Sequence, residues 1–290
     1  MRSPSASAFL ALLKPVTWFP PMWAYACGVI SSGVAPAGRA LDVALGVFLA
    51  GPLVCGTSQV VNDWFDRHVD AINEPDRPIP SGRVPGQAAF YIAIGWTMLS
   101  LGVAALLGPV VLVASVLGLL LAWLYSMPPV RLKANGWFGN SAVGFAYEGL
   151  PWITGAAVMT QQVPSGPVFA AALLYSVGAH GIMTLNDFKA LEGDHRMGVR
   201  SLPVQLGPDR AAKLACWTMA VPQLFVAGML GWLGLVLHAA GVLALVAAQL
   251  ACMPRLLSDP RAHAPWYNGT GVGLFVSGMM LTAFALRGLP

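Results

Sequence analysis

The stretch NDWFDRHVDAINEPDRPIPSG, residues 62–82, contains five of the twelve acidic residues of this chain and lies between two apolar segments. The chain has 290 residues, of which 57% are hydrophobic and only 10% are charged. Soluble proteins are about a quarter charged, so the composition predicts a protein embedded in a lipid bilayer. Apolar runs follow one another along almost the whole length, which predicts one all-α membrane domain, residues 1–290.

The apolar runs have the length of membrane-spanning helices. A bilayer core about 30 Å thick is crossed by about 20 apolar residues in a helix. The first run contains Pro20 and Pro21, so its helix is expected to be kinked or to begin late. We predict nine membrane spans, at about 16–34, 41–61, 88–107, 109–127, 138–160, 167–184, 214–233, 236–253 and 268–287.

The charged residues alternate with the predicted spans. All sixteen Lys and Arg residues except Arg39 and Arg287 lie in the N-terminal segment or in every second loop. Ten of the twelve acidic residues lie in the same loops or at the helix ends that lead into them. Cytoplasmic loops are enriched in Lys and Arg, so the N-terminus is predicted in the cytoplasm and the C-terminus on the opposite side. An active site is expected on the cytoplasmic side, in loops at about 62–87 and 185–213. The basic residues are scattered, so no nucleic-acid partner is expected.

The first acidic cluster has helical spacing. Asn62, Asp66 and Asp70 recur every four residues, which places them on one face of a helix. Carboxylates at this spacing repel each other unless a positive charge lies between them. Oxygen ligands with room for water suit Mg²⁺. The proline-rich segment PDRPIPSG that follows cannot continue the helix, and it is expected to form a stiff loop that brings Arg77 back over the metal site.

A second acidic cluster lies in the stretch LNDFKALEGDHRMGVRSLP, residues 185–203, and contains Asp187, Glu192 and Asp194. Two acidic patches can hold two divalent ions, and two ions can clamp a diphosphate. Cations that accompany phosphate oxygens are available near both clusters: Arg67, Arg77, Lys189, Arg196 and Arg200. The alternative interpretation of either cluster is a solvated loop whose charges balance.

Several motifs carry a family resemblance. NDWFDRHVD matches the NxxxDxxxD motif of the UbiA-type intramembrane prenyltransferases. The strings KPVTWFPPMWAY (14–25), YSMPPVRLK (125–133) and HGIMTLNDFKALEGD (180–194) resemble the branch of that family that esterifies chlorophyll-type pigments. Many family members have DxxxD as the second motif, whereas this chain has Ala190 four residues before Asp194. The DFKxxEGD form found here is that of the pigment branch.

The resemblance implies a UbiA-type helical bundle in the bacterial inner, photosynthetic membrane. It also implies Mg²⁺-dependent transfer of a geranylgeranyl or phytyl group, from geranylgeranyl diphosphate or phytyl diphosphate to the 17-propionate of bacteriochlorophyllide a. Two Mg²⁺ ions would bridge the diphosphate, and Tyr125, Arg131 and Lys133 would hold it or shield the carbocation. The acceptor is a carboxylate already ionised at neutral pH, so no catalytic base is required.

Two further side chains are candidates for pigment binding. Glu148 is the one acid well inside a predicted span, and ionisable groups in membranes often have functional roles. It could bind polar groups or the magnesium of the pigment, or it could be a protonated structural acid. His180 could be an axial ligand of that magnesium or could contact a neighbouring helix.

Other functions stay open from the sequence. Chlorophyllide a or a quinone-type aromatic ring could replace bacteriochlorophyllide a as acceptor. A pigment-binding assembly factor without catalysis would also use a polar cavity. A transporter is less consistent, because transporters place charged sites near the bilayer midplane and these acids lie at one membrane face.

Overall fold

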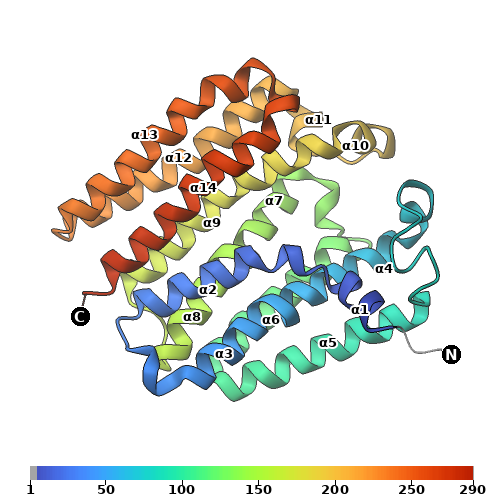
Figure 1. The fold of residues 1–290 in the computed structure, drawn as a ribbon, viewed down its shortest axis with the longest axis horizontal. Coiled ribbons are helices and arrows are strands. Elements are labelled where there is room, and N and C mark those ends of the chain that lie inside the picture. The colour runs from blue at the N-terminus through green and yellow to red at the C-terminus, as the bar shows by residue number, and fades with distance from the viewer. Residues whose placement is uncertain (1–4, 290) are drawn as a thin grey trace.

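The computed structural model describes residues 5–289, and its named elements are all helical (Figure 1). The first half contains α1 (Ala6–Leu13), α2 (Phe19–Ser31), α3 (Ala40–Phe48), the π-helix η3 (Leu49–Cys55), α4 (Gly56–Asn73), α5 (Gly86–Leu107) and α6 (Pro109–Ser126). The second half contains α7 (Gly136–Gly144), the π-helix η5 (Phe145–Gly149), α8 (Leu150–Thr160), α9 (Gly166–Asp187), α10 (Leu191–Met197), α11 (Leu202–Leu206), α12 (Pro208–Trp232), α13 (Val236–Ser258) and α14 (Pro260–Leu286). Short 3₁₀ helices lie at η1 (Pro15–Thr17), η2 (Pro36–Arg39), η4 (Leu132–Ala134) and η6 (Phe188–Ala190). The all-α prediction is confirmed.

Within residues 5–289, seven helical runs are long and apolar enough to cross a membrane. They are Pro36–Asn73, Gly86–Leu107, Pro109–Ser126, Gly166–Met197, Pro208–Trp232, Val236–Ser258 and Pro260–Leu286. Each corresponds to one predicted span, which supports an integral membrane protein.

The two remaining predicted spans form shorter or interrupted helices. In the span 16–34, α2 begins only at Phe19 and has 13 residues, because Pro20 and Pro21 occupy its first turn. The span 138–160 is divided into α7, η5 and α8. The count of nine spans therefore stays a prediction.

The helices form two groups with a third set between them (Figure 1). On one side α9, α12, α13 and α14 pack together, and on the other α4, α5 and α6 pack together. Between them, α2 packs on α8 and α14, and α7 packs on α9. Buried aromatic residues such as Trp152 and Tyr175 hold α8 against α9, with ring centroids 5.6 Å apart.

Helices α2 and α8 approach each other backbone to backbone. A Cβ atom on Gly28 would lie 2.0 Å from the carbonyl oxygen of Trp152, and one on Gly155 would lie 2.1 Å from that of Tyr25. Such small-residue contacts are typical of helix packing in membranes. They join α2, and with it one wall of the cavity described below, to the rest of the bundle.

Replacing Gly155 by Val is therefore expected to destabilise the fold strongly. The new side chain meets backbone atoms, which cannot move aside as a flexible side chain can, so we expect a loss of about 3 kcal/mol or more. Thermal unfolding in detergent would measure it against Gly228→Val, a site on α12 where an added Cβ would meet nothing within 4 Å. Equal melting temperatures for the two variants would contradict the close packing of α2 on α8.

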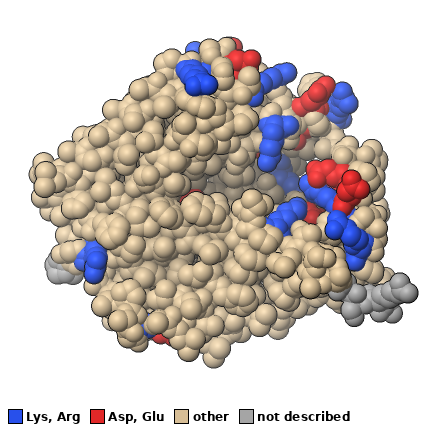
Figure 2. Space-filling model, viewed as in Figure 1, with Lys and Arg blue, Asp and Glu red and all other residues tan. Residues whose placement is uncertain are grey.

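Charged side chains gather at one end of the bundle. On the face shown in Figure 2 they cluster near the end of α4 and near α10, while most of the remaining surface is uncharged. Arg39 lies apart from them and pairs with Asp42 at 3.7 Å. Arg2, which was assigned to the charged side from the sequence, lies outside the described residues. We refer to this region as the charged end of the bundle.

Candidate active site

A cavity of about 910 Å³ lies between the two helix groups, and both acidic motifs contribute to its wall. Figure 2 shows the surface hollowed on this face, between α2 and α14. The polar part of the lining includes Ser58, Gln59, Tyr147 and Glu148 as well as the residues near the two acidic motifs: Asn62, Asp66, Asp70, Glu74, Arg77, Tyr125, Arg131, Lys133, Asn140, Asn186, Asp187, Lys189 and Asp194. Apolar side chains of α2, η3, α6, α8 and α14 line the rest, among them Leu49, Val54, Leu121, Leu150 and Val276. The cavity thus joins a charged mouth to an apolar interior.

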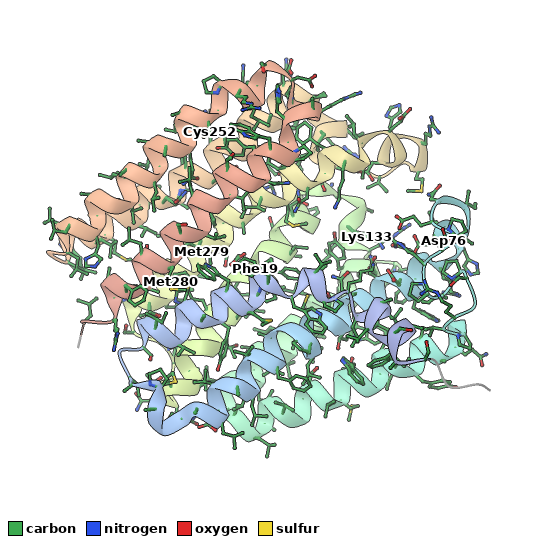
Figure 3. The ribbon with its side chains drawn as sticks, in the orientation of Figure 1. Phe19, Asp76, Lys133, Cys252, Met279 and Met280 are labelled. Atoms are coloured by element: carbon green, nitrogen blue, oxygen red, sulfur yellow. The ribbon has the colours of Figure 1, made fainter. Side chains whose placement is uncertain are left out.

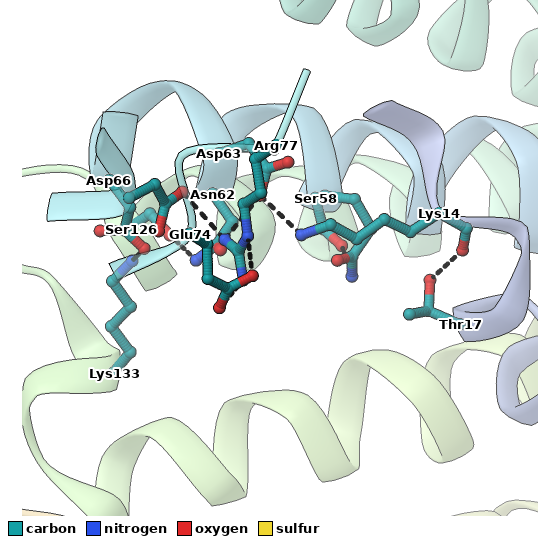
Figure 4. A network of polar contacts seen from close by, with 12 residues as sticks. Lys14, Thr17, Ser58, Asn62, Asp63, Asp66, Glu74, Arg77, Ser126 and Lys133 are labelled. Carbon is teal, nitrogen blue, oxygen red and sulfur yellow. Dashed lines mark hydrogen bonds and ion pairs between the residues drawn. The ribbon is translucent and has the colours of Figure 1, made fainter. Parts of the chain in front are cut away.

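The first motif presents one face of α4 to this cavity. Asn62, Asp66 and Asp70 all line it, as their spacing of four residues requires on a helix. The side-chain amide of Asn62 donates to the Ser126 hydroxyl at 3.1 Å (Figure 4). That bond ties α4 to the end of α6, so the motif is held by a neighbouring helix.

Asp66 is paired with two cations from the segment after α6. Lys133 Nζ donates to Asp66 Oδ2, and Arg131 Nη2 lies 3.4 Å from Asp66 Oδ1. Burial lowers the pKa of the Lys133 ammonium, and the neighbouring Asp66 carboxylate offsets only part of that effect. Figure 3 shows Lys133 inward of Asp76, which lies on the outer loop after α4. The charge of Asp66 is therefore neutralised by residues that themselves line the cavity.

Arg77 returns from the proline-rich loop to the acidic face of α4 (Figure 4). Its Nη1 lies 2.9 Å from Asp70 Oδ2 and 3.3 Å from Asp63 Oδ1, and Glu74 binds its guanidinium at 2.5 and 2.8 Å. Burial lowers the pKa of Arg77, but the carboxylates of Glu74, Asp63 and Asp70 more than offset this, so the pKa lies above its ordinary value. Lys14 completes the network at 2.6 Å from Asp63 Oδ1.

The second motif reaches the same cavity from α9 and α10. Asp187, Lys189 and Asp194 line it, and Asp187 Oδ2 accepts a hydrogen bond from Asn140 Nδ2 at 3.0 Å. The backbone of Arg200 pairs with that of residues 134–136, at 2.8 and 3.0 Å, in a single parallel bridge. This bridge joins the loop after α10 to the segment that carries Lys133.

Five predicted site residues are not among those that line the cavity: Arg67, His180, Glu192, Arg196 and Arg200. Arg67 lies over the Trp64 ring, 4.4 Å from its centroid, because one step along a helix turns a side chain by about 100° away from Asp66. Glu192 pairs with Arg196 at 3.1 Å on the exposed side of α10. Arg200 contributes its backbone to the bridge, and the His180 ring lies against Trp137, with centroids 5.7 Å apart.

Several polar side chains that were not predicted from the sequence support the site. Asn140 holds Asp187, Asn268 Nδ2 donates to Asn186 Oδ1 at 3.0 Å, and Lys14 holds Asp63. Asn140 and Asn268 are isolated amides inside or beside predicted spans, and burial of an amide without a partner is costly. That cost is the signal by which they could have been found.

Comparison with known proteins agrees with this geometry. A model described as the UbiA prenyltransferase family matches residues 12–279. The chain is 58% identical to the bacteriochlorophyll synthase 33 kDa chain of Cereibacter sphaeroides, covering 99% of this chain and 95% of that one. It is 38% identical to the chloroplastic chlorophyll synthase of Oryza sativa subsp. japonica, covering 95% and 76%.

Solved structures share the fold. The structure of a UbiA homologue from Archaeoglobus fulgidus, bound to DMAPP and Mg²⁺, has a TM-score of 0.73 at 22% identity, covering 97% of this chain and 99% of that one. The family match extends over most of the chain, and both acidic motifs lie within it. This chain is therefore a prenyltransferase that belongs to the UbiA prenyltransferase family.

Proposed function

We propose that this chain transfers a geranylgeranyl or phytyl group from its diphosphate to the 17-propionate of bacteriochlorophyllide a, the bacteriochlorophyll synthase reaction. The observation that carries the proposal is the convergence of both acidic motifs and four cations on the mouth of one largely apolar cavity. A diphosphate with an oily tail and an oily pigment with a carboxylate both match such a cavity. The choice of pigment rests on the similarity to named bacteriochlorophyll synthases.

The donor groups at the mouth suit Mg²⁺ that binds together with a diphosphate. Residues 5–289 contain no group of three or more His, Cys, Asp or Glu side chains placed to hold an ion. Mg²⁺ commonly uses only one or two carboxylates and completes its shell with water and substrate phosphates. Asn62, Asp66 and Asp70 on one wall, with Asp187 and Asp194 on the other, provide that number of carboxylates for each of two ions. Bound Mg²⁺ would neutralise the charge that develops on the leaving diphosphate.

The cations at the mouth would hold the same diphosphate. Arg131, Lys133 and Lys189 line the cavity and can donate to phosphate oxygens, while Arg77 keeps the carboxylate of Asp70 in place. The carbon–oxygen bond of the donor breaks with its electron pair leaving on diphosphate, and the allylic carbon becomes a delocalised cation. The apolar walls exclude water, which would otherwise capture that cation.

The acceptor needs no base from the protein. Its propionate is ionised at neutral pH, so an oxygen lone pair of the carboxylate forms the new ester bond to the allylic carbon. In this proposal the charged end of the bundle faces the cytoplasm, since it carries most of the Lys and Arg residues. Because its product would be a photosynthetic pigment, we place the protein in the bacterial photosynthetic membrane.

The test is an ester-forming assay. Membranes that contain the protein are incubated with bacteriochlorophyllide a, Mg²⁺, and either geranylgeranyl or phytyl diphosphate, and the esterified pigment is measured by chromatography. We expect ester with wild type and at least a hundredfold less with EDTA, because one preorganised electrostatic contact commonly contributes about 10²–10³ in rate. Parallel reactions contain chlorophyllide a and a quinone-ring acceptor.

The parallel reactions with different acceptors identify the class of acceptor substrate. Preference for bacteriochlorophyllide a supports the proposal, and preference for chlorophyllide a would reassign the pigment. Prenylation of the quinone ring alone, by folded protein, would overturn the pigment proposal and leave a UbiA-family aromatic prenyltransferase. Pigment binding without ester formation from any donor would indicate a non-catalytic assembly factor.

A further inference from the structure

Glu148 is a buried acid in the cavity wall that prenyl transfer, as described above, does not use. It lines the cavity, is only 4% exposed, and lies on the π-helix η5 between α7 and α8. Its Oε2 atom is buried without a hydrogen-bond partner among the described residues. The acids Asp66, Asp70 and Asp187 each have a partner, so Glu148 differs from these three acids.

The backbone around Glu148 is held in place by close packing. A Cβ atom on Gly149 would lie 2.2 Å from Ser176 Oγ, and one on Gly144 would lie 2.6 Å from the Ser176 carbonyl oxygen. Because both residues lack a side chain, η5 and the end of α7 pack directly against α9. A π-helical turn within an α-helix is often found at functional sites. Here it fixes the position of Glu148 in the cavity wall.

The neighbouring residue provides a contrast. Tyr147 also lines the cavity, but its hydroxyl has partners at 3.0 Å from Gln59 Nε2 and 3.3 Å from both Ser58 Oγ and Cys55 Sγ. The Tyr147 hydroxyl thus has its hydrogen-bond partners within the protein, whereas the carboxyl group of Glu148 is available to a ligand.

An unpaired carboxyl group in this position calls for a polar ligand. An ionised carboxylate without a counter-charge is costly in an apolar surround, and among the described residues Glu148 takes part in no ion pair within 4.0 Å. A carboxylic acid group avoids that cost and can donate one hydrogen bond. The prenyl chain is a hydrocarbon and offers no acceptor atom, whereas its diphosphate belongs at the charged mouth. The ring carbonyl groups of a chlorophyll-type macrocycle are acceptors of the required kind.

We propose that Glu148, as a carboxylic acid, donates a hydrogen bond to a ring carbonyl oxygen of the acceptor pigment and so positions the macrocycle in the cavity. This inference rests on the proposed function, because it assigns a contact to the pigment named there. Glu148 is a binding residue for the macrocycle and takes no part in breaking or forming the ester bond.

The experiment measures the bound pigment directly, without turnover. Resonance Raman spectra of bacteriochlorophyllide a are recorded on the purified full chain with no prenyl diphosphate present. A hydrogen bond lowers the stretching frequency of a carbonyl group. We expect one ring carbonyl band below its free frequency in wild type and in Glu148→Gln, which keeps a donor, and at the free frequency in Glu148→Leu. Tyr147→Phe is the matched control on the same turn and should keep the lowered band.

Steady-state kinetics give a second readout. Glu148→Leu is expected to raise KM for the pigment about tenfold, the effect of one lost hydrogen bond, with KM for the prenyl diphosphate unchanged. Glu148→Gln should restore most of the pigment affinity. A merely structural role would change both KM values or the melting temperature instead.

The outcomes separate this inference from the function on which it rests. A lowered band that survives in Glu148→Leu, or free frequencies for every ring carbonyl in wild type, overturns the role of Glu148 while pigment esterification stands. The outcome in which every ring carbonyl of the bound pigment has its free frequency is read from the wild-type spectrum alone, so it can be tested even if the Glu148→Leu protein does not fold. Failure of wild type to bind the pigment overturns both proposals, whereas a lowered band without ester formation overturns the proposed function alone.

Discussion

Replacing Asp66 by Asn is expected to reduce the kcat of prenyl transfer by about 10²–10³-fold or more, the loss typical of removing one preorganised electrostatic contact. Asp66 lies on the cavity face of α4, opposite the wall formed by Asp187 and Asp194. The substitution keeps the size of the side chain and removes its charge. Without that charge, the Mg²⁺ of the proposed mechanism would lose a ligand and would neutralise the diphosphate less well, so the leaving group would depart less readily.

The matched control for this variant is Asp76→Asn. Asp76 lies on the loop after α4, is exposed and does not line the cavity. Both variants make the same chemical change within the stretch 62–82, so they differ in whether the carboxylate lines the cavity. Rates are measured at saturating substrate in detergent or membranes, with melting temperatures to verify folding. A folded Asp66→Asn protein that retains more than a third of wild-type kcat would contradict the role of Asp66.

Replacing Arg77 by Met is expected to lower both activity and stability. Arg77 contacts Asp63, Asp70 and Glu74, and Asp63 is almost fully buried. Breaking a fully buried ion pair costs about 3–5 kcal/mol. We expect less, about 2 kcal/mol, because Lys14 remains on Asp63 and the Arg77 side chain is 26% exposed. With Asp70 no longer held, kcat should fall about a hundredfold.

Arg83→Met is the control for this second prediction. Arg83 lies six residues further along the same loop, and it donates to Ser81 and to the Asp76 carbonyl outside the cavity. Its loss should shift the melting temperature and kcat by little. Arg77→Lys should recover part of the stability, since a lysine provides one cation but not the fork that reaches three carboxylates. Equal behaviour of the Arg77→Met and Arg83→Met proteins would show that Arg77 does not organise the site.

Local patterns in the sequence were sufficient for much of the fold. Apolar length alone identified the seven runs that the structure forms as long apolar helices, because each run must be about as long as the bilayer is thick. Helical spacing alone placed Asn62, Asp66 and Asp70 on one face, which lines the cavity. The prolines in the first run correctly predicted the late start of α2.

Position in the sequence alone did not predict which side chains point into the cavity. Arg67, Glu192 and Arg200 lie close in sequence to cavity residues, yet they pack on Trp64, pair on an exposed surface, or contribute only backbone. Proximity in sequence brings a helical residue near a site but does not decide which way it points. Arg67 is turned about 100° away from Asp66 on α4, whereas Arg200 lies outside the helices and its position is set by the bridge to Asn135.

By itself, then, the sequence determined the all-helical class, the length and most positions of the apolar helices, and which residues of α4 share a face. These are properties of single segments, set by hydrophobic length and helical period. Only the tertiary structure decided that Lys133 meets Asp66, that Asn140 meets Asp187 and that Lys14 meets Asp63. Each of these pairs joins segments 47 to 67 residues apart. Their meeting depends on how whole helices pack against one another, which no local pattern specifies.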